Sequence, residues 1–386
     1  MSEQYSKPPQ GTNEKLPPYT IDLVVVGGGI AGCAIAWEAI RRQRSVAMID
    51  FHNPNSSSRV AAGLVTPITG NRLAPSWEFD SFFPQADNLY QFAQSLTGKN
   101  FWEKKPALRI FLNSEESERF NSKWPTDQLG VIQATRFSAN QFPDLHAPWG
   151  GFSMQPAARL NTQCYLQATQ DYLQNHRALF LHQLNLPSDL QPSESGFLIP
   201  GLKLEAKYVC LALGTSALHQ NCFPALDLHP ARGDILKIIP PPTSCLATID
   251  SVIHKDAWLV PLANGTALLG ATYDRHTADT DPASPIGIKA KEQLIERLAT
   301  WFPPTSRSPY KPPDIIDHRA AIRPASYDRH PLIGPHPNHP NLICLNGLGS
   351  KGSLLAPKLA STLWDWLESK SPIPKSLLWN RRYSKP

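Results

Sequence analysis

One short stretch near the N-terminus constrains the fold more than any other part of this 386-residue chain. Four consecutive aliphatic residues, 23–26, predict a strand buried on both faces, because a strand with one solvated face would alternate apolar and polar side chains. Directly after them, Gly27, Gly29 and Gly32 have the spacing G-x-G-x-x-G. In a dinucleotide-binding βαβ unit, the first glycine permits a tight turn. The second admits a pyrophosphate close to the backbone, and the third lets the next helix pack on the strand.

The residues after this turn complete the pattern. A helix is expected to start at Ile30 and Ala31, with its N-terminal amides facing the phosphates. A second buried strand over residues 45–49 ends at Asp50, where a carboxylate can accept hydrogen bonds from an adenosine ribose. A lone G-x-G-x-x-G also matches ordinary glycine-rich turns, but here the strand, turn, helix, strand and acid occur in order. The stretch therefore predicts a dinucleotide site and leaves NAD and FAD equally open.

Length and charge limit the remaining possibilities. A chain of 386 residues is long for one core, so two domains are expected. The net charge is +5, but no run of Lys and Arg marks a nucleic-acid surface, and we do not expect a nucleic-acid partner. The six cysteines form no C-x-x-C pair, which argues against a zinc site and a disulfide framework.

Targeting signals are also missing from the sequence pattern. No apolar segment is long enough to span a bilayer, and the N-terminus is polar, so we expect a cytoplasmic protein without a membrane partner. Residues 1–20 lack apolar periodicity and predict a disordered extension.

Two further segments have functional and plain structural explanations of equal weight. In the polar loop after Asp50, Ser57, Ser58 and Arg59 could meet phosphates or ribityl hydroxyls, and the small residues that follow, including Ala62 and Gly63, could let the backbone approach a flat ring. A surface loop with a turn explains the same residues. Similarly, Gly214 ends a buried strand over residues 208–214, either to leave room for a cofactor or simply to end the strand.

The chain leaves this first domain twice. Residues 76–150 and 229–314 contain short strand patterns with aromatic residues and turn signals, typical of an antiparallel substrate domain. Residues 21–75, 151–228 and 315–386 are assigned to the dinucleotide-binding domain. Helices are expected near residues 86–96, 159–174 and 289–301.

A second strand and glycine-rich turn lie near the C-terminus. A buried strand over residues 342–345 precedes a helix from about Leu354 to Glu368, with Ser353 as its N-cap and Pro357 in its first four residues. Together with Lys351, the helix N-terminus would stabilise the negative charge of a reduced flavin. A capped C-terminal helix explains the pattern without a ligand, but two such units favour an extended dinucleotide, FAD. The residues expected at the ligand are Gly347, Gly349, Ser350, Lys351, Gly352 and Ser353.

In combination, these motifs resemble the FAD-dependent oxidoreductases of the D-amino-acid oxidase superfamily, especially the glycine oxidase and sarcosine oxidase branch. The resemblance covers residues 21–370. Besides the two glycine-rich turns, it depends on residues 61–64, 232–233, 260–261, 270–272, 322–324, 328, 331 and 333–334. The run Gly-Leu-Gly-Ser-Lys-Gly at 347–352 is also similar to the oxidase half of a bifunctional enzyme that modifies a tRNA wobble uridine.

The resemblance implies an α/β fold in which a Rossmann-like FAD-binding domain is interleaved with an α+β antiparallel-sheet substrate domain. It implies oxidation of a small amine or amino acid by hydride transfer to flavin N5, hydrolysis of the imine, and reoxidation by oxygen or another electron acceptor. Arg323 matches the family arginine that holds a substrate carboxylate, and Trp258 falls where relatives place a tyrosine over the substrate.

Departures from the family pattern refine these expectations. Val60 stands where some members attach flavin through a histidine, and no cysteine lies near Arg323, so FAD is expected to be non-covalent. Ser350 replaces an arginine and Trp258 replaces a tyrosine, which puts glycine and sarcosine in doubt as substrates. The alternatives are a tRNA wobble-uridine side-chain oxidase and a non-catalytic flavin-binding protein.

Overall fold

The computed structural model describes residues 19–139, 141, 142, 145–224, 226–241, 246, 249–302 and 311–382. The expected disordered extension therefore lies outside the described residues, except that Tyr19 and Thr20 begin the first strand. Among the described residues, no helix combines the length and apolar character needed to cross a bilayer.

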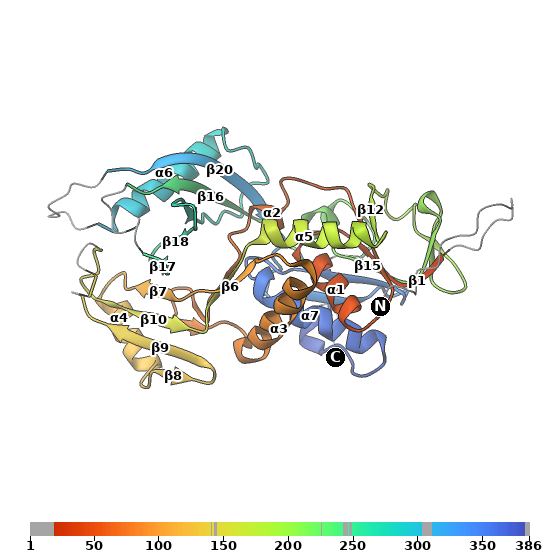
Figure 1. Cartoon of the computed structure of the whole chain (residues 1–386), viewed down its shortest axis with the longest axis horizontal. Helices are drawn as coiled ribbons and strands as arrows, with labels where there is room; N and C mark the ends of the chain where they lie inside the picture. Colours follow the sequence, from red (N-terminus) through yellow and green to blue (C-terminus); the bar gives the residue numbers. More distant parts are fainter. Residues whose placement is uncertain are drawn as a thin grey trace.

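An eight-stranded sheet forms one half of the molecule (Figure 1). Its parallel strands are β12 (Leu179–Leu181), β2 (Val46–Asp50), β1 (Tyr19–Val26), β15 (Leu204–Leu211) and β22 (Leu342–Asn346). Three antiparallel strands, β13 (Gln191–Pro192), β14 (Phe197–Ile199) and β21 (Leu332–Pro335), extend it. The two functional glycine-rich turns follow β1 and β22, which lie on either side of β15.

The aliphatic run in β1 is buried on both faces, as its sequence predicts. Leu23 and Val25 pack into a core with the helices α1 (Ile30–Arg41), α3 (Phe79–Thr97), α5 (Thr162–Asn175) and α7 (Gly352–Leu367). Val24 and Val26 pack into a second core on the opposite face. A strand in this position has no solvated side and so tolerates no polar alternation.

A nine-stranded, almost entirely antiparallel sheet forms the other half. Its spatial order is β20 (Asp314–Arg323), β16 (Ala231–Ile239), β19 (Ala267–Gly270), β18 (Trp258–Pro261), β17 (Val252–His254), β7 (Ala107–Ile110), β10 (Gly151–Gln155), β9 (Ile132–Phe137) and β8 (Gln128–Leu129). Helix α6 (Pro285–Ala299) contributes Leu294 and Leu298 to the core on one face of this sheet, and α4 (Ser114–Lys123) contributes Phe120 to the core on the other. The expected combination of a Rossmann-like domain and an antiparallel-sheet domain is confirmed.

The strand pairing does not follow the domain boundaries expected at residues 151 and 315. Strand β10 pairs with β7 and β9, and β20 pairs along its length with β16, so both belong to the antiparallel sheet. Helix α3, within the expected substrate segment 76–150, instead packs its buried face into the core formed by α1 and α7. The helix expected at 159–174 begins later, because Arg159 lies in β11 and Asn161 caps α5 by accepting a hydrogen bond from the amide of Cys164 at 3.3 Å.

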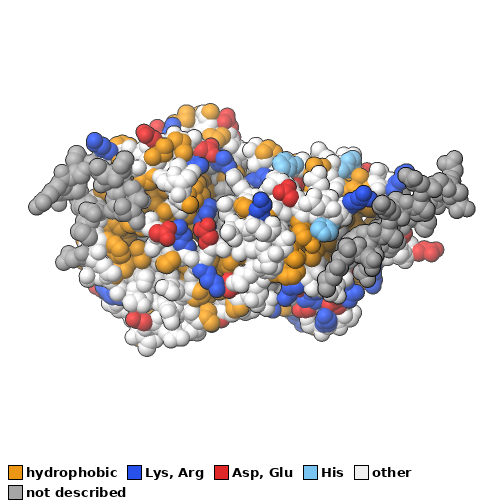
Figure 2. All heavy atoms as spheres, viewed as in Figure 1, with side chains coloured by type: hydrophobic (Ala, Val, Ile, Leu, Met, Phe, Trp, Pro, Cys, Tyr) orange, Lys and Arg blue, Asp and Glu red, His pale blue; other side chains and the backbone are white. Residues whose placement is uncertain are grey.

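The remaining elements connect the two halves. A three-stranded sheet contains β3 (Leu64–Val65), β11 (Ala158–Leu160) and β6 (Trp102–Lys104), and a small hairpin contains β4 (Ile68–Thr69) and β5 (Ala74–Pro75). The short helices are α2 (Ser57–Val60), η1 (Pro200–Leu202), η2 (Gly214–Leu218) and η4 (Lys375–Leu377). On the face shown in Figure 2, Lys and Arg side chains lie among Asp and Glu side chains and form no continuous basic area.

Candidate functional site

A cavity of about 560 Å³ lies between the carboxyl ends of the parallel strands and the antiparallel sheet. Ligands bind in this position in doubly wound α/β folds. Most of the residues predicted from the sequence line it: Gly27, Gly29, Ile30, Ala31, Asp50, Ser57, Ser58, Arg59, Ala62, Gly63, Gly214, Trp258, Arg323, Gly349, Ser350, Gly352 and Ser353. Gly32, Gly347 and Lys351 do not.

The first glycine-rich turn has steric reasons for its composition. Gly27 has a φ of 109°, and a Cβ there would lie 2.5 Å from the carbonyl oxygen of Ala212. A Cβ on Gly32 would lie 1.9 Å from the carbonyl oxygen of Gly27. Gly32 thus lies at the contact between α1 and the turn, which is the role of the third glycine of the motif. This position is outside the cavity.

Asp50 is held by two partners that the sequence did not indicate. Its Oδ1 accepts a hydrogen bond from the amide of Gly28 at 3.0 Å, and its Oδ2 accepts one from Nε2 of Gln170 at 3.2 Å. A Cβ on Gly28 would lie 2.7 Å from Oδ2, so a larger residue at this position would clash with the carboxylate. These contacts fix the carboxylate at the edge of the cavity, where the ribose of a dinucleotide binds in this type of fold.

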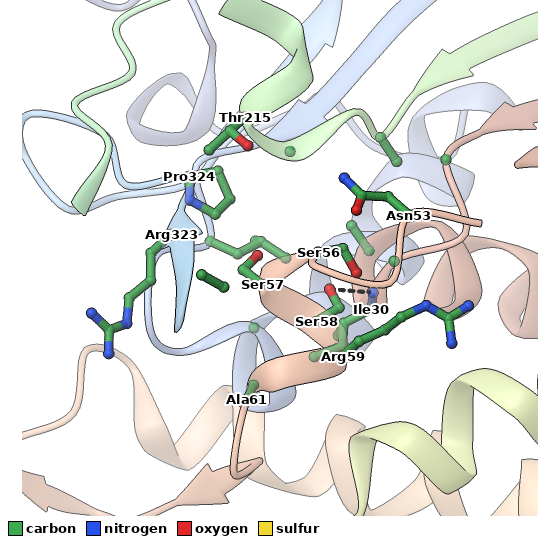
Figure 3. Close-up of a pocket in the computed structure, with 18 of the residues that line it drawn as sticks. Ile30, Asn53, Ser56, Ser57, Ser58, Arg59, Ala61, Thr215, Arg323 and Pro324 are labelled. Carbon is green, nitrogen blue, oxygen red and sulfur yellow. Dashed lines mark hydrogen bonds between the residues drawn. The ribbon is translucent and has the colours of Figure 1, made fainter. Parts of the chain in front are cut away.

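The loop after β2 folds into α2 and reaches the start of α1. Ser58 Oγ accepts a hydrogen bond from the amide of Ile30 at 3.1 Å, one of the first amides of α1, which have no partner within the helix (Figure 3). Arg59 contacts the ring Nδ1 of His52 at 3.1 Å. In the close-up, Arg59 lies on one side of this group of residues and Arg323 on the other.

Gly63 is required by the fold as well as by the cavity. Its φ is 75°, and a Cβ there would lie only 1.8 Å from the carbonyl oxygen of Leu160 in β11. The structural reason for this glycine is thus the neighbouring strand, although Ala62 and Gly63 both line the cavity.

The second glycine-rich turn joins two strand ends. Asn346, the last residue of β22, donates a hydrogen bond from Nδ2 to the carbonyl oxygen of Gly214 at 2.8 Å. Helix α7 starts at Gly352 with Lys351 as N-cap, which corrects the expected N-cap at Ser353. Among the described residues no side chain caps this end, which leaves the amides of Gly352 and Ser353 at the cavity wall without a side-chain partner.

Lys351 turns away from the cavity. Its Nζ lies 3.4 Å from Thr69 Oγ1 and 3.3 Å from Ser76 Oγ, and burial followed by the charge of Arg329 lowers the pKa of Lys351. Lys351 does not line the cavity, and its predicted role toward the charge of a reduced flavin stays a prediction.

Helix α7 contains Pro357 as its sixth residue, further inside than expected. Proline has no amide hydrogen, so the carbonyl of Ser353 lacks its helical donor. The hydroxyl of Tyr90 in α3 donates a hydrogen bond to this carbonyl at 2.9 Å. A side chain from the segment expected in the other domain thereby completes the first turns of a cavity-lining helix.

Arg323, the last residue of β20, lies at the end of the cavity formed by the antiparallel sheet. Its Nη1 donates to the carbonyl oxygens of Arg232 and Thr272 at 3.1 and 3.2 Å, and its guanidinium lies 5.5 Å from the ring centre of Tyr273. A Cβ on Gly233 would lie 2.0 Å from Nη2, so the guanidinium packs directly on that glycine.

The charge of Arg323 lies beside neutral carbonyl groups. Among the described residues, no Asp or Glu carboxylate lies within ion-pairing distance of it, and burial lowers the pKa of its guanidinium. Carbonyl oxygens hold the group in place without neutralising it, which leaves an anion-binding group at the cavity.

Trp258 begins β18 and is half-buried. Its ring packs on Gly270, where a Cβ would lie 2.5 Å from the ring atom Cζ2, and it packs against the main core while lining the cavity. The sequence missed other lining residues, among them Thr215, Gln220 and Asn346, because they lie in a short helix, a loop and a strand end without a recognisable motif.

Together these features fit FAD. Two helix N-termini, of α1 and α7, and the carboxylate of Asp50 border one cavity, which continues to Trp258 and Arg323 on the other sheet. A dinucleotide with a reactive ring needs this combination of a phosphate site, a ribose acceptor and a separate substrate wall.

Comparisons with known proteins also indicate FAD. The family described as FAD dependent oxidoreductase matches residues 22–366. The chain is similar to the tRNA 5-methylaminomethyl-2-thiouridine biosynthesis bifunctional protein MnmC of Marinobacter nauticus, with 25% identity over 394 residues that cover 94% of this chain and 57% of that protein. The MnmC protein of Pseudomonas fluorescens is also 25% identical, over 92% of this chain and 57% of its own length. The chain thus spans a little over half the length of these curated relatives.

Solved structures share the fold. Glycine oxidase from Bacillus cereus has a TM-score of 0.74 at 19% identity, covering 92% of this chain and 96% of that one. Glycine oxidase from Geobacillus kaustophilus has a TM-score of 0.70 at 20% identity with the same coverage. Iminodiacetate oxidase from Chelativorans has a TM-score of 0.69 at 16% identity, covering 92% of this chain and 98% of that one. With a family match over most of its length, the chain belongs to the FAD-dependent oxidoreductases of the D-amino-acid oxidase family.

Proposed function

We propose that this protein oxidises a small amine or amino acid that carries a carboxylate, with non-covalently bound FAD. The observation that carries the proposal is Arg323, a half-buried arginine at the cavity whose guanidinium contacts carbonyl oxygens but no carboxylate of the described residues. A guanidinium held in this way matches a carboxylate in charge and in fork geometry.

FAD supplies the redox chemistry by accepting a hydride from the carbon bonded to nitrogen, and the resulting imine hydrolyses. The chain supplies position and electrostatics. Arg323 orients the carboxylate, Trp258 forms a flat wall at the same end of the cavity, and the amides at the start of α7 would stabilise the negative charge of a reduced cofactor. The reaction needs no strong protein base if the amine enters neutral, so we assign none.

Anaerobic bleaching of the yellow protein by a panel of amines and amino acids tests this function. We expect bleaching by a carboxylate-bearing amine, and Arg323→Ala should raise the concentration needed by about ten- to a hundredfold, because charged hydrogen bonds contribute roughly 1.5–3 kcal/mol each. Arg319→Ala is the matched control, since Arg319 lies on the same strand but pairs with Asp317 outside the cavity. An unchanged requirement in Arg323→Ala would refute the assigned role.

The same preparation tests the cofactor and acceptor. Acid precipitation should release FAD into the supernatant, whereas a yellow precipitate would contradict non-covalent binding. Reoxidation of the bleached protein by dissolved oxygen distinguishes an oxidase from a dehydrogenase that uses another electron acceptor. Bound FAD that no member of the panel reduces would favour a non-catalytic flavin-binding protein.

The curated relatives favour a second candidate, oxidation of a wobble-uridine side chain in tRNA. The MnmC proteins match 92–94% of this chain, although the chain spans only 57% of their length. The exposed ring of Tyr273 beside Arg323 is a surface on which a base can stack. Salt-sensitive binding of unmodified and modified tRNA distinguishes this candidate, because each phosphate contact releases counterions.

A further inference from the structure

A fully buried ion pair lies behind Arg323 in the antiparallel sheet. Arg232 and Asp234, both in β16, form a fork in which Arg232 Nε and Nη2 lie 2.9 and 2.8 Å from Asp234 Oδ2 and Oδ1. Arg232 has no exposed surface and Asp234 has 1%. Arg232 Nη1 also donates to the carbonyl oxygen of Asp279 at 2.7 Å. Neither side chain lines the cavity.

Asp234 connects three chain segments. Its Oδ2 accepts a hydrogen bond from the hydroxyl of Thr272, after β19, at 2.8 Å, and its amide donates back to that hydroxyl at 2.9 Å. Its Oδ1 lies 3.0 Å from Nε2 of His318 in β20. One carboxylate therefore links β16, the end of β19, and β20, the strand that ends at Arg323.

The two carbonyls that hold Arg323 belong to the residues that Asp234 binds. Arg323 Nη1 donates to the backbone oxygens of Arg232 and Thr272. We propose that Asp234 is a positioning residue for Arg323: by fixing Arg232 and Thr272 it sets where the guanidinium meets the substrate carboxylate. This inference rests on the proposed function, because it assumes that Arg323 binds a carboxylate.

The charge arrangement suits this role. The carboxylate of Asp234 is matched by the fork of Arg232, so Arg323 is positioned by a network that contains an acid without being paired to that acid. Bidentate recognition depends on the orientation of the guanidinium, and a displacement of about 1 Å at a positioned group can cost roughly a hundredfold. Weakening the network should therefore lower the affinity for anions more than the affinity for neutral ligands of the same shape.

The experiment uses the FAD-loaded protein and the pair benzoate and benzamide, which differ in charge but little in shape. Titration followed by flavin absorbance gives the two dissociation constants. We expect Asp234→Asn to weaken benzoate binding by tenfold or more and benzamide binding by less than threefold. Thr272→Val should weaken benzoate binding in the same selective way, and Thr272→Ser, which keeps the hydroxyl, should restore it.

Glu116→Gln is the matched control. Glu116 and Arg109 form another buried carboxylate–arginine pair of the same half of the molecule, away from the cavity. We expect this variant to lower the melting temperature while leaving the ratio of benzoate to benzamide affinity unchanged. If Asp234→Asn does not fold, the two variants Thr272→Val and Thr272→Ser provide the same test without removing the buried charge.

The outcomes distinguish the positioning role of Asp234 from the carboxylate-binding role of Arg323. If Arg323→Ala loses benzoate selectivity while Asp234→Asn and Thr272→Val keep it, the positioning role is wrong and the proposed function stands. If Arg323→Ala and the wild-type protein bind benzoate equally, or benzoate fails to perturb the wild-type flavin, the carboxylate role of Arg323 itself is wrong.

Discussion

Replacing Gly233 by alanine should disable the anion site without a substitution at Arg323. The new Cβ would lie 2.0–2.2 Å from the guanidinium atoms, whereas real Cβ contacts essentially never fall below 3.0 Å. The backbone at Gly233 is not in the left-handed region, so alanine adds no strain of its own. The flexible arginine must therefore move by about 1 Å or more, while β16 keeps its conformation.

The size of the effect follows from the contacts that this movement removes. The guanidinium would leave its two carbonyl partners and the position where a carboxylate forms a fork. Losing one charged hydrogen bond of roughly 1.5–3 kcal/mol predicts an about ten- to hundredfold weaker carboxylate interaction. The free energy of unfolding should change much less, because the displaced group is the end of a side chain and not the backbone.

Flavin-monitored benzoate titration and urea unfolding of Gly233→Ala provide the two measurements. Gly201→Ala is the control, because a Cβ there meets no atom within 4 Å and its φ is also unstrained. If Gly233→Ala folded, bound FAD and kept wild-type benzoate affinity, the steric argument and the assigned position of Arg323 would both be refuted.

Three further predictions concern the cofactor domain and its stability. Gly32→Ala should give little FAD-containing protein by absorbance, since its Cβ would lie 1.9 Å from a backbone oxygen; a normal yield of yellow protein would contradict this. Tyr90→Phe should lower the free energy of unfolding in urea by about 1–3 kcal/mol by leaving a buried carbonyl without a donor. Tyr165→Phe should cost little, because that buried hydroxyl has no partner among the described residues, and equal losses would disprove the distinction. Burial alone would raise the pKa of Asp328, but hydrogen bonds from Arg381 lower it to about 2. Its contribution to stability is therefore complete above about pH 4 and is lost as the pH falls toward 2; Asp328→Asn should flatten this part of the profile of urea midpoints.

The sequence predicted the elements whose pattern is local. The unbroken aliphatic residues 23–26 and the spacing of the three glycines are local patterns. Gly32 also has a local steric cause in Gly27 and Val25, whereas Gly27 and Gly29 meet the distant residues Ala212 and Ser58. Asp50 lies at the cavity as expected.

Features that depend on distant partners could not be predicted in this way. Strand β20 carries Asp317, His318 and Arg319 in succession, which hides its apolar pattern, and its assignment follows only from pairing with β16. The reason for Gly233 is visible only when Arg323, ninety residues later, lies on it. Likewise, the sequence placed the N-cap of the C-terminal helix at Ser353, whereas α7 begins at Gly352 with Lys351 as its N-cap.

The hydrogen bond from Tyr90 to Ser353 has a consequence for evolution and for protein engineering. The hydroxyl that compensates for Pro357 comes from α3, within residues 76–150, the excursion expected to belong to the substrate domain. Replacing this excursion as a unit would remove a donor from the helix that faces the cofactor. A segment exchanged for α3 therefore has to keep a donor for this carbonyl of α7, whereas substitutions in the nine-stranded sheet leave this hydrogen bond intact.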